Sequence, residues 1–161
     1  MSESGEGFRG EVAGVFIASG EGQPMQSCQE VSAEVGRGLA GDRYYNDAGT
    51  FKDGPRKSEV TLIESEALEA IKREHDIDFG AHENRRNIVT RGVPLNHLVG
   101  QTFSVGSTVL EGLRLAEPCQ YLEELTGKPV RKPLVHRGGL RAKIIKGGPI
   151  RVGDRISLQD R

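Results

Sequence analysis

The apolar residues of this chain fall in short runs that glycine-rich turns separate. Val31, Ala33 and Val35 alternate with polar residues, which is the period of a half-buried strand. Similar alternation, or a short unbroken apolar run, predicts strands at residues 9–18, 26–35, 60–63, 87–90, 101–105, 107–115, 140–146 and 150–158. The first two are expected to pair as a hairpin, and the fifth and sixth as a second hairpin about Gly106.

One segment, SEALEAIKREH, has the period of a helix instead. Ser65 is its predicted N-cap, and Leu68 and Ile71 form its apolar stripe. Glu69 is expected to pair with Arg73 one turn later in the helix. This is the clearest helix that the sequence predicts.

Two shorter helical turns and one long connection complete the pattern. The turns are predicted at residues 94–99 and 119–125, with Gly127 placed to end the second. Residues 36–55 form an irregular connection that is too long for an idle loop in a compact domain. Aromatic residues in it argue against disorder, namely Tyr44, Tyr45 and Phe51.

Many short strands, few helices and 22 glycines in 161 residues indicate a mainly β fold. We expect a closed or partly closed β-barrel with a few short inserted helices. The length fits a single domain over residues 1–161, in which residues 1–8 read as a flexible terminus.

Charge and composition narrow the class of partner. The net charge of −1 argues against nucleic acid, and no apolar run is long enough to cross a membrane. The start, MSESGEGFRGEV, lacks the apolar core of a signal peptide, so a cytoplasmic location is expected. In that reducing compartment Cys28 and Cys119 are expected to be free thiols. Of the 22 basic residues 15 are arginine, the side chain that binds phosphate and carboxylate through two hydrogen bonds.

Four segments, taken together and in this order, resemble the MOSC family, which is named for the molybdenum-cofactor sulfurase C-terminal domain. They are GLAGDRY at residues 38–44, ENRRNIVTRGVPLNHLVGQTFSVG at residues 83–106, EPC at residues 117–119 and HRGGLRAKIIKGGPIRVGDRI at residues 136–156. One departure is Tyr44, because members of the family often have His or Gln after the Gly-Asp-Arg step.

The resemblance implies a fold like the pyruvate-kinase β-barrel and a role in sulfur or molybdenum-cofactor chemistry. It also implies that Cys119 is the functional cysteine. Relatives include sulfur-delivering domains and molybdenum-containing reductases of N-hydroxylated compounds.

The surroundings of Cys119 in the sequence fit a reactive thiol. Pro118 favours an extended chain before it, and the short helix predicted after it would place the sulfur near a helix N-terminus, which favours the thiolate. A thiolate can ligate molybdenum or carry sulfur as a persulfide. Neighbouring glutamates oppose ionisation, so a positive partner is needed, for which the candidates are His136, Arg137 and Arg91. The alternative is a buried and inert Cys119, and Cys28 is expected to be structural.

Arginines beside glycines predict an anion site. Glycine lets the backbone approach an anion, while the neighbouring guanidinium binds it. The expected cofactor-binding residues are Asp42, Arg43, Asn87, Arg91, His136, Arg137 and Gly138. Two alternatives stay open, in which Asp42 only orients an arginine and Asn87 only holds the end of its strand. Arg85 and Arg86 are expected to be solvated, with the alternative that one of them points inward.

The residues leave three functions open. The first is binding of a molybdenum-pterin cofactor, or sulfur transfer, with Cys119 as molybdenum ligand or sulfur carrier. The second is a molybdenum-dependent reductase, and the third is a non-catalytic barrel that binds an anion or a partner. We expect a sulfur donor or cofactor-pathway protein as partner and a monomer or homodimer. Zinc, nucleotides and pyridoxal phosphate are not expected, since no zinc spacing or phosphate loop occurs.

Overall fold

The structure is a computed structural model that describes residues 7–20, 22–43, 45, 58–80, 83–118 and 120–159, with backbone only at residues 120–122. Cys119, Tyr44 and most of the predicted connection at residues 36–55 therefore lie outside the described residues, as do residues 1–6.

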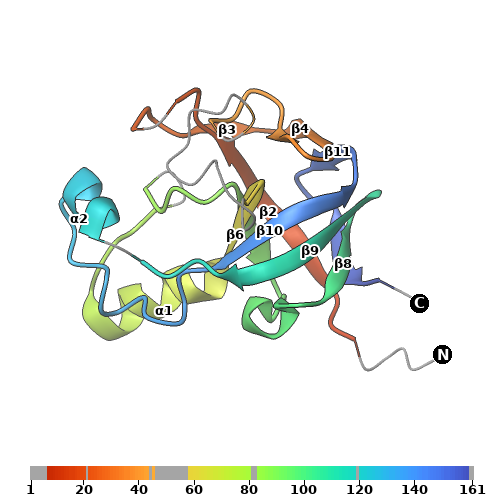
Figure 1. Ribbon diagram of the computed structural model, residues 1–161. Coiled ribbons are helices and arrows are strands. Elements are labelled where there is room, and N and C mark those ends of the chain that lie inside the picture. The colour runs from red at the N-terminus through yellow and green to blue at the C-terminus, as the bar shows by residue number, and fades with distance from the viewer. Residues whose placement is uncertain are drawn as a thin grey trace.

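A closed barrel of seven strands forms the centre of the fold (Figure 1). Around the barrel the strands are β12 (Arg155–Leu158), β8 (Thr102–Val105), β9 (Thr108–Leu115), β10 (Leu140–Lys146), β6 (Val60–Glu64), β7 (Ile88–Arg91) and β2 (Gly10–Ile17), and β12 pairs with β2 to close it. All neighbours are antiparallel except β6 and β7, which are parallel and are joined through α1 (Ser65–His75). The predicted fold class is confirmed.

A second, smaller sheet packs on the barrel and shares its core. It consists of β11 (Gly148–Arg151), β4 (Glu30–Glu34) and β5 (Gly38–Leu39). Val31, Leu39 and Ile150 of this sheet belong to the same buried cluster as Phe103 and Leu140 of the barrel. One core therefore extends through both sheets.

Two strands that the sequence predicts as continuous are each split between the sheets. In the first, β3 (Gln26–Cys28) pairs with β2 as a hairpin, whereas β4 pairs with β11 and β5. In the second, a turn separates β11 from β12; there Gly153 has a φ of 94° and the Asp154 carboxylate accepts the Arg151 N–H at 2.8 Å. The alternation of apolar and polar residues indicates that a strand is half buried, but it does not indicate with which strand it pairs.

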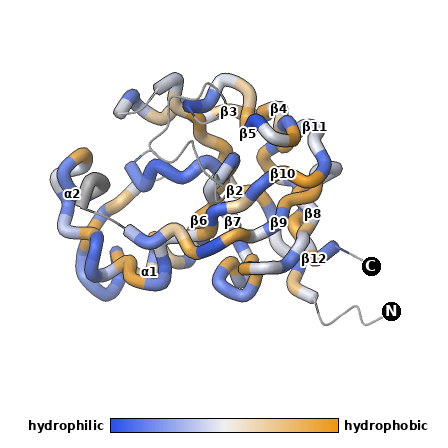
Figure 2. Tube along the Cα trace, in the orientation of Figure 1, coloured by the Kyte–Doolittle hydropathy of each residue, from blue (hydrophilic) through white to orange (hydrophobic). Residues whose placement is uncertain are grey.

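The β6, β7 and β2 strands are covered on their outer face as well as their inner face. Leu62 and Ile88 point into the barrel core and are fully buried. On the outer side Ile63, Val89 and Phe16 form a second buried cluster. Figure 2 shows the resulting concentration of apolar residues along the barrel strands. This doubly covered part of the wall carries most of the residues described below.

The predicted helices are present, but the contacts of α1 differ from expectation. Glu64, not Ser65, is the N-cap of α1 and makes no side-chain cap hydrogen bond, because its carboxylate instead accepts the Leu95 N–H at 2.9 Å. The Ser65 hydroxyl contacts the Glu66 carboxylate at 3.4 Å. Glu69 pairs with Arg91 of β7 at 3.5 Å, across to the barrel wall and not along the helix to Arg73.

The two shorter helical turns occur where they are predicted. They are η1 (Leu95–Leu98), a 3-10 turn, and α2 (Gln120–Thr126). Gly127 ends α2 with a φ of 72°, and its N–H donates to the Glu123 carbonyl at 2.8 Å. Within the described residues, no helix is long and apolar enough to span a membrane.

Candidate functional site

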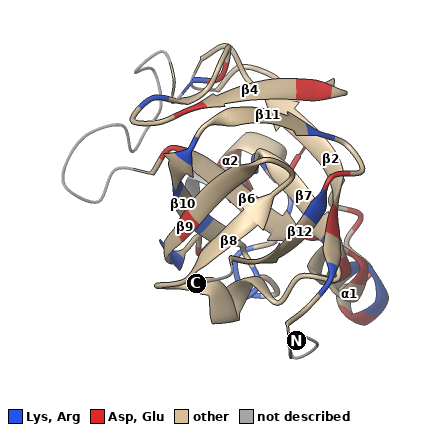
Figure 3. Cartoon of the chain, turned by 90° about the vertical axis from the view of Figure 1, so that its right-hand side faces the viewer, with Lys and Arg blue, Asp and Glu red and all other residues tan. Residues whose placement is uncertain are grey.

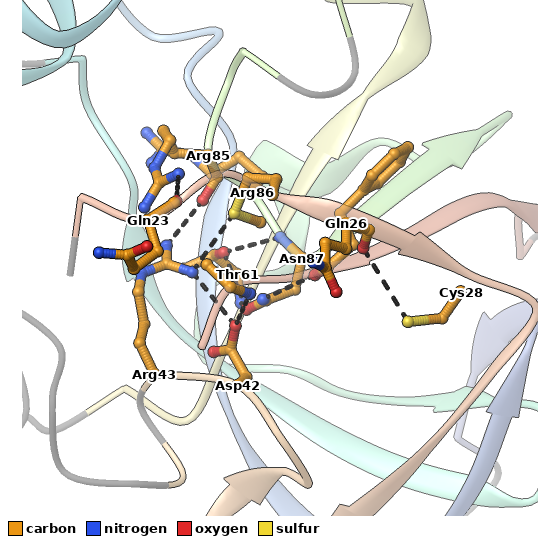
Figure 4. Close-up of polar contacts among 12 residues, drawn as sticks. Gln23, Gln26, Cys28, Asp42, Arg43, Thr61, Arg85, Arg86 and Asn87 are labelled. Carbon is orange, nitrogen blue, oxygen red and sulfur yellow. Dashed lines mark hydrogen bonds and ion pairs between the residues drawn. The ribbon is translucent and has the colours of Figure 1, made fainter. Parts of the chain in front are cut away.

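Asp42 and Arg43 form a buried ion pair on the outer side of the barrel wall. The Asp42 carboxylate is fully buried; it accepts the Ala18 N–H at 3.0 Å and Arg43 Nη1 at 3.2 Å. Arg43 is only 5% exposed, and it also donates to the Arg85 carbonyl at 2.9 Å and to the Met25 sulfur at 3.6 Å (Figure 4). Asp42 therefore orients Arg43. The sequence analysis left this role of Asp42 open as an alternative to contact with a cofactor.

Arg85 and Arg86 are buried, so the expectation that they are solvated is wrong. Each is 8% exposed, and Arg85 has a φ of 67°. Arg85 donates to the Gln23 carbonyl. Arg86 donates from Nε to the Gly138 carbonyl at 2.7 Å and from Nη2 to the Ala116 carbonyl at 2.8 Å. The sequence gives only a weak signal for this, namely two arginines directly before a buried strand.

Asn87 is fully buried and ties three segments of the barrel together. Its Oδ1 accepts the Thr61 N–H of β6 at 3.0 Å and the Thr61 hydroxyl at 3.2 Å. Its Nδ2 donates to the Phe16 carbonyl of β2 at 3.0 Å. These contacts place Asn87 as a clamp at the start of β7, which is the other alternative that the sequence left open.

The segment that leads to Cys119 lies against the segment that contains His136 and Gly138. The Glu117 carboxylate accepts the His136 N–H at 2.8 Å, and its second oxygen lies 2.9 Å from His136 Nδ1. A side-chain Cβ at Gly138 would lie only 2.2 Å from the Ala116 carbonyl oxygen, so the close approach needs glycine there. Together with Arg86, these contacts fix residues 116–118, and α2 begins directly after position 119.

Arg137 lies at the edge of a cleft of about 380 Å³ between α1, η1 and residues 136–139. Its side chain is 36% exposed and donates to Glu74 of α1 at 2.8 Å. That hydrogen bond is the main reason why the pKa of Glu74 is lowered from its ordinary value. Glu64 lines the same cleft, and its burial raises the pKa of its carboxyl.

Arg91 lies apart from the other predicted site residues. It is at the far end of β7, about 13 Å along the strand from Asn87 at the usual rise of about 3.3 Å per residue. There it lines a separate hollow of about 300 Å³ with Arg9 and Arg155. The structure thus brings Asp42, Arg43, Asn87 and Gly138 to the Arg85-Arg86 segment, whereas His136 and Arg137 line the cleft beside α1 and Arg91 lines a separate hollow.

Cys28 fits the structural role predicted for it. It is partly buried against the main core, and its sulfur lies 3.9 Å from the Gln26 carbonyl. Burial raises the pKa of its thiol, which disfavours the reactive thiolate. Among the residues that the structure describes, no group of three or more His, Cys, Asp and Glu is placed to hold a metal ion.

Comparison with known families assigns the chain to a class. The model of the MOSC domain matches residues 40–157, so the chain belongs to the MOSC family. This family is associated with the molybdenum cofactor, and the function of the chain is of the general MOSC type. None of the curated proteins matches the chain.

Solved structures share the fold at low sequence identity. The YUAD protein from Bacillus subtilis is 15% identical with a TM-score of 0.79, and the match covers 96% of this chain and 98% of that one. YiiM from Geobacillus stearothermophilus is 14% identical with a TM-score of 0.68, over 94% of this chain and 76% of that one. YiiM from Escherichia coli is 16% identical with a TM-score of 0.67, over 96% and 70%.

Proposed function

We propose that the chain binds a molybdenum-pterin-type cofactor or carries sulfur, and that Cys119 is its reactive thiolate. The observation that supports this most directly is the position of Arg86. Its guanidinium holds the carbonyls of Ala116 and Gly138, so a permanent positive charge stands beside the backbone that leads to Cys119. A nearby guanidinium favours the thiolate over the thiol.

The acidic neighbour that opposes ionisation is itself engaged. Both oxygens of Glu117 are bonded to His136, one to the backbone N–H and one to the ring. The charge of Arg43 is balanced by its ion pair with Asp42, and Arg43 supports the segment through the Arg85 carbonyl. In this proposal Arg86 supplies the positive charge that a thiolate at Cys119 needs.

The donor set fits a molybdenum-pterin cofactor. Such a cofactor supplies two-electron redox chemistry at a metal that binds soft thiolate ligands and a phosphate that binds guanidinium groups. Cys119 would be the metal ligand, while Arg137 and His136, which line the open cleft, would hold the phosphate. Asp42, Arg43, Asn87 and Gly138 would shape and support the site through the contacts described above.

The same thiolate would serve for sulfur transfer. It would attack the outer sulfur of a persulfide on a donor protein, whose thiolate leaves, and so become a persulfide itself. A nucleophile of an acceptor in the molybdenum-cofactor pathway would then attack that outer sulfur and release the Cys119 thiolate. The buried arginines would then hold the segment rigid without touching the cargo. Partners of this kind, a cytoplasmic location and a monomer or homodimer are parts of this proposal.

The test is metal and pterin analysis combined with intact mass, on protein made in a host that synthesises the molybdenum cofactor. Molybdenum that is present in the wild type and absent from Cys119→Ser supports the cofactor. An adduct with the mass of one sulfur atom that Cys119→Ser alone removes supports the carrier. Cys28→Ser is the matched control and is expected to change neither result. Wild-type protein with no molybdenum, no pterin and no sulfur adduct would refute the proposal.

A non-catalytic barrel is the second candidate, and one observation favours it. Three buried guanidinium groups donate to backbone carbonyls, those of Arg43, Arg85 and Arg86. Such contacts are typical of arginines that stabilise a fold. In that case Cys119→Ser would leave the protein's stability and its anion binding unchanged, and no cysteine-dependent activity would be found.

A further inference from the structure

A second group of arginines surrounds a hollow at the edge of the barrel where β12, β2 and β7 run side by side, on the right of Figure 3. The hollow has a volume of about 300 Å³ and is lined by Arg9, Arg91 and Arg155 together with Gly10, Gly92 and Gly153. It is separate from the site around Arg86, since Arg91 and Asn87 lie at opposite ends of β7.

The strand register brings the charges of this hollow together. Arg155 of β12 is the partner of Glu11 in β2, and Glu11 is in turn the partner of Arg91 in β7. Arg9 directly precedes β2 and lines the same hollow. Three guanidinium groups from three neighbouring segments therefore surround one space.

Of these three arginines, Arg91 is the one whose guanidinium is paired with an acidic side chain among the described residues. Glu69 of α1 pairs with Arg91 at 3.5 Å, and Glu11 lines the hollow itself. Over the part of the chain that the structure describes, neither Arg9 nor Arg155 takes part in an ion pair. The Glu66 carboxylate also accepts the N–H of Gly92 at 2.8 Å, so three glutamates balance the three arginines, but the two unpaired guanidinium groups keep their donors available.

The glycines keep the hollow open. Gly92 and Gly153 have φ values of 75° and 94°, which other residues adopt only with strain. A Cβ at Gly153 would meet no atom within 4 Å, so nothing packs over that turn. The space between the guanidinium groups is therefore accessible to a ligand.

We propose that this hollow binds a phosphoryl dianion, as free phosphate or as the phosphate group of a small molecule. Arginine binds tetrahedral oxyanions through charge-assisted hydrogen bonds, and donors from three directions suit a group with several equivalent oxygens. The small volume and the net charge of −1 argue against a nucleic acid or a membrane surface as the occupant. The site does not depend on Cys119, so it is independent of the function proposed above.

The experiment is a titration of the full chain with sodium phosphate at constant ionic strength, followed by backbone amide NMR. Saturable shifts are expected at the amides of Gly10, Gly92 and Gly153, with a dissociation constant on the order of 1 mM. The double variant Arg9→Gln/Arg155→Gln is expected to weaken binding by at least about tenfold, because it removes two charged donors. A parallel titration with glycerol phosphate separates the two sources, since tighter binding than that of inorganic phosphate indicates a phosphorylated small molecule.

The matched control is Lys72→Gln/Lys143→Gln, which removes the same charge from exposed lysines that are ion-paired and do not line the hollow. This control is expected to bind phosphate like the wild type, as is Cys119→Ser. Three results would overturn the proposal: no saturable binding, equal weakening in the control, or shifts centred on Gly138 in place of the three glycines. A thermal melt of each variant verifies that it is folded.

Discussion

Replacing Gly138 by alanine tests the close approach that fixes the segment before Cys119. The new Cβ would lie 2.2 Å from the Ala116 carbonyl oxygen and 3.0 Å from Pro118 Cδ. The two segments must then move apart by roughly 1 Å to regain normal van der Waals distances. They cannot do so freely, because the single guanidinium of Arg86 is bonded to the carbonyls of both Gly138 and Ala116.

We expect Gly138→Ala to lower the free energy of unfolding by about 2–3 kcal/mol. Forcing an extra carbon into a packed site costs about 1–3 kcal/mol, and weakening a charge-assisted hydrogen bond adds to that. Urea denaturation measures the change. In a Cys28→Ser background, the rate at which Cys119 is alkylated at neutral pH should change as well, because the chain on its N-terminal side is displaced.

Gly20→Ala is the matched control for this substitution. The nearest atom to its new Cβ would be Gln23 Cγ at 3.5 Å, an ordinary contact, so its effect should stay within about 0.5 kcal/mol. If Gly138→Ala is as stable as this control and its cysteine reacts at the wild-type rate, the packing of the two segments does not govern the site, and the reasoning fails.

Three further substitutions test the network around this segment. Arg86→Gln should cost about 3 kcal/mol in urea denaturation, since two buried carbonyls lose a charged donor; a loss below about 0.5 kcal/mol would contradict this. Asn87→Ala should cost at least about 2 kcal/mol by the same measurement, because it removes the buried hydrogen bonds of Asn87 to Thr61 and to the Phe16 carbonyl, and unchanged stability would disprove the clamp. Glu64→Gln should change the pH dependence. The raised pKa of the Glu64 carboxyl means that its contribution to stability is present below the ordinary glutamate pKa and is lost as pH rises through the folded value. In thermal melts from acid to neutral pH, the melting temperature of the variant should therefore rise relative to that of the wild type. A difference in melting temperature that does not change with pH would contradict the burial argument.

The fold was largely predictable from local pattern. The ends of α1 and the hairpin about Gly106 follow from periodicity and from one glycine, both of which are properties of neighbouring residues. The division of residues 26–35 between two sheets was not predictable. It depends on the pairing of β4 with β11, and the residues of a strand do not indicate a partner that is distant in the sequence.

The candidate site shows the same limit more sharply. The segments that meet at Arg86 were recognised in the sequence, but the roles of individual arginines were not. Arg86 is buried because its guanidinium donates to two carbonyls from distant segments. Arg91, at the other end of β7, is exposed and pairs only with Glu69 on the surface of α1 among the described residues. A charged side chain can be buried only where the fold places hydrogen-bond partners around it, and the spacing of residues in the sequence does not reveal those partners.

The pairing of β2 with β12 joins the first and last strands of the barrel, with Gly10 opposite Ile156. A ribosome must therefore release almost the whole chain before the wall can be sealed, and until then β2 and β8 expose unpaired backbone to other chains. Folding should be slow compared with that of helical proteins of this size, and shortening the chain to end before Arg155 should cause aggregation and not merely lower the melting temperature.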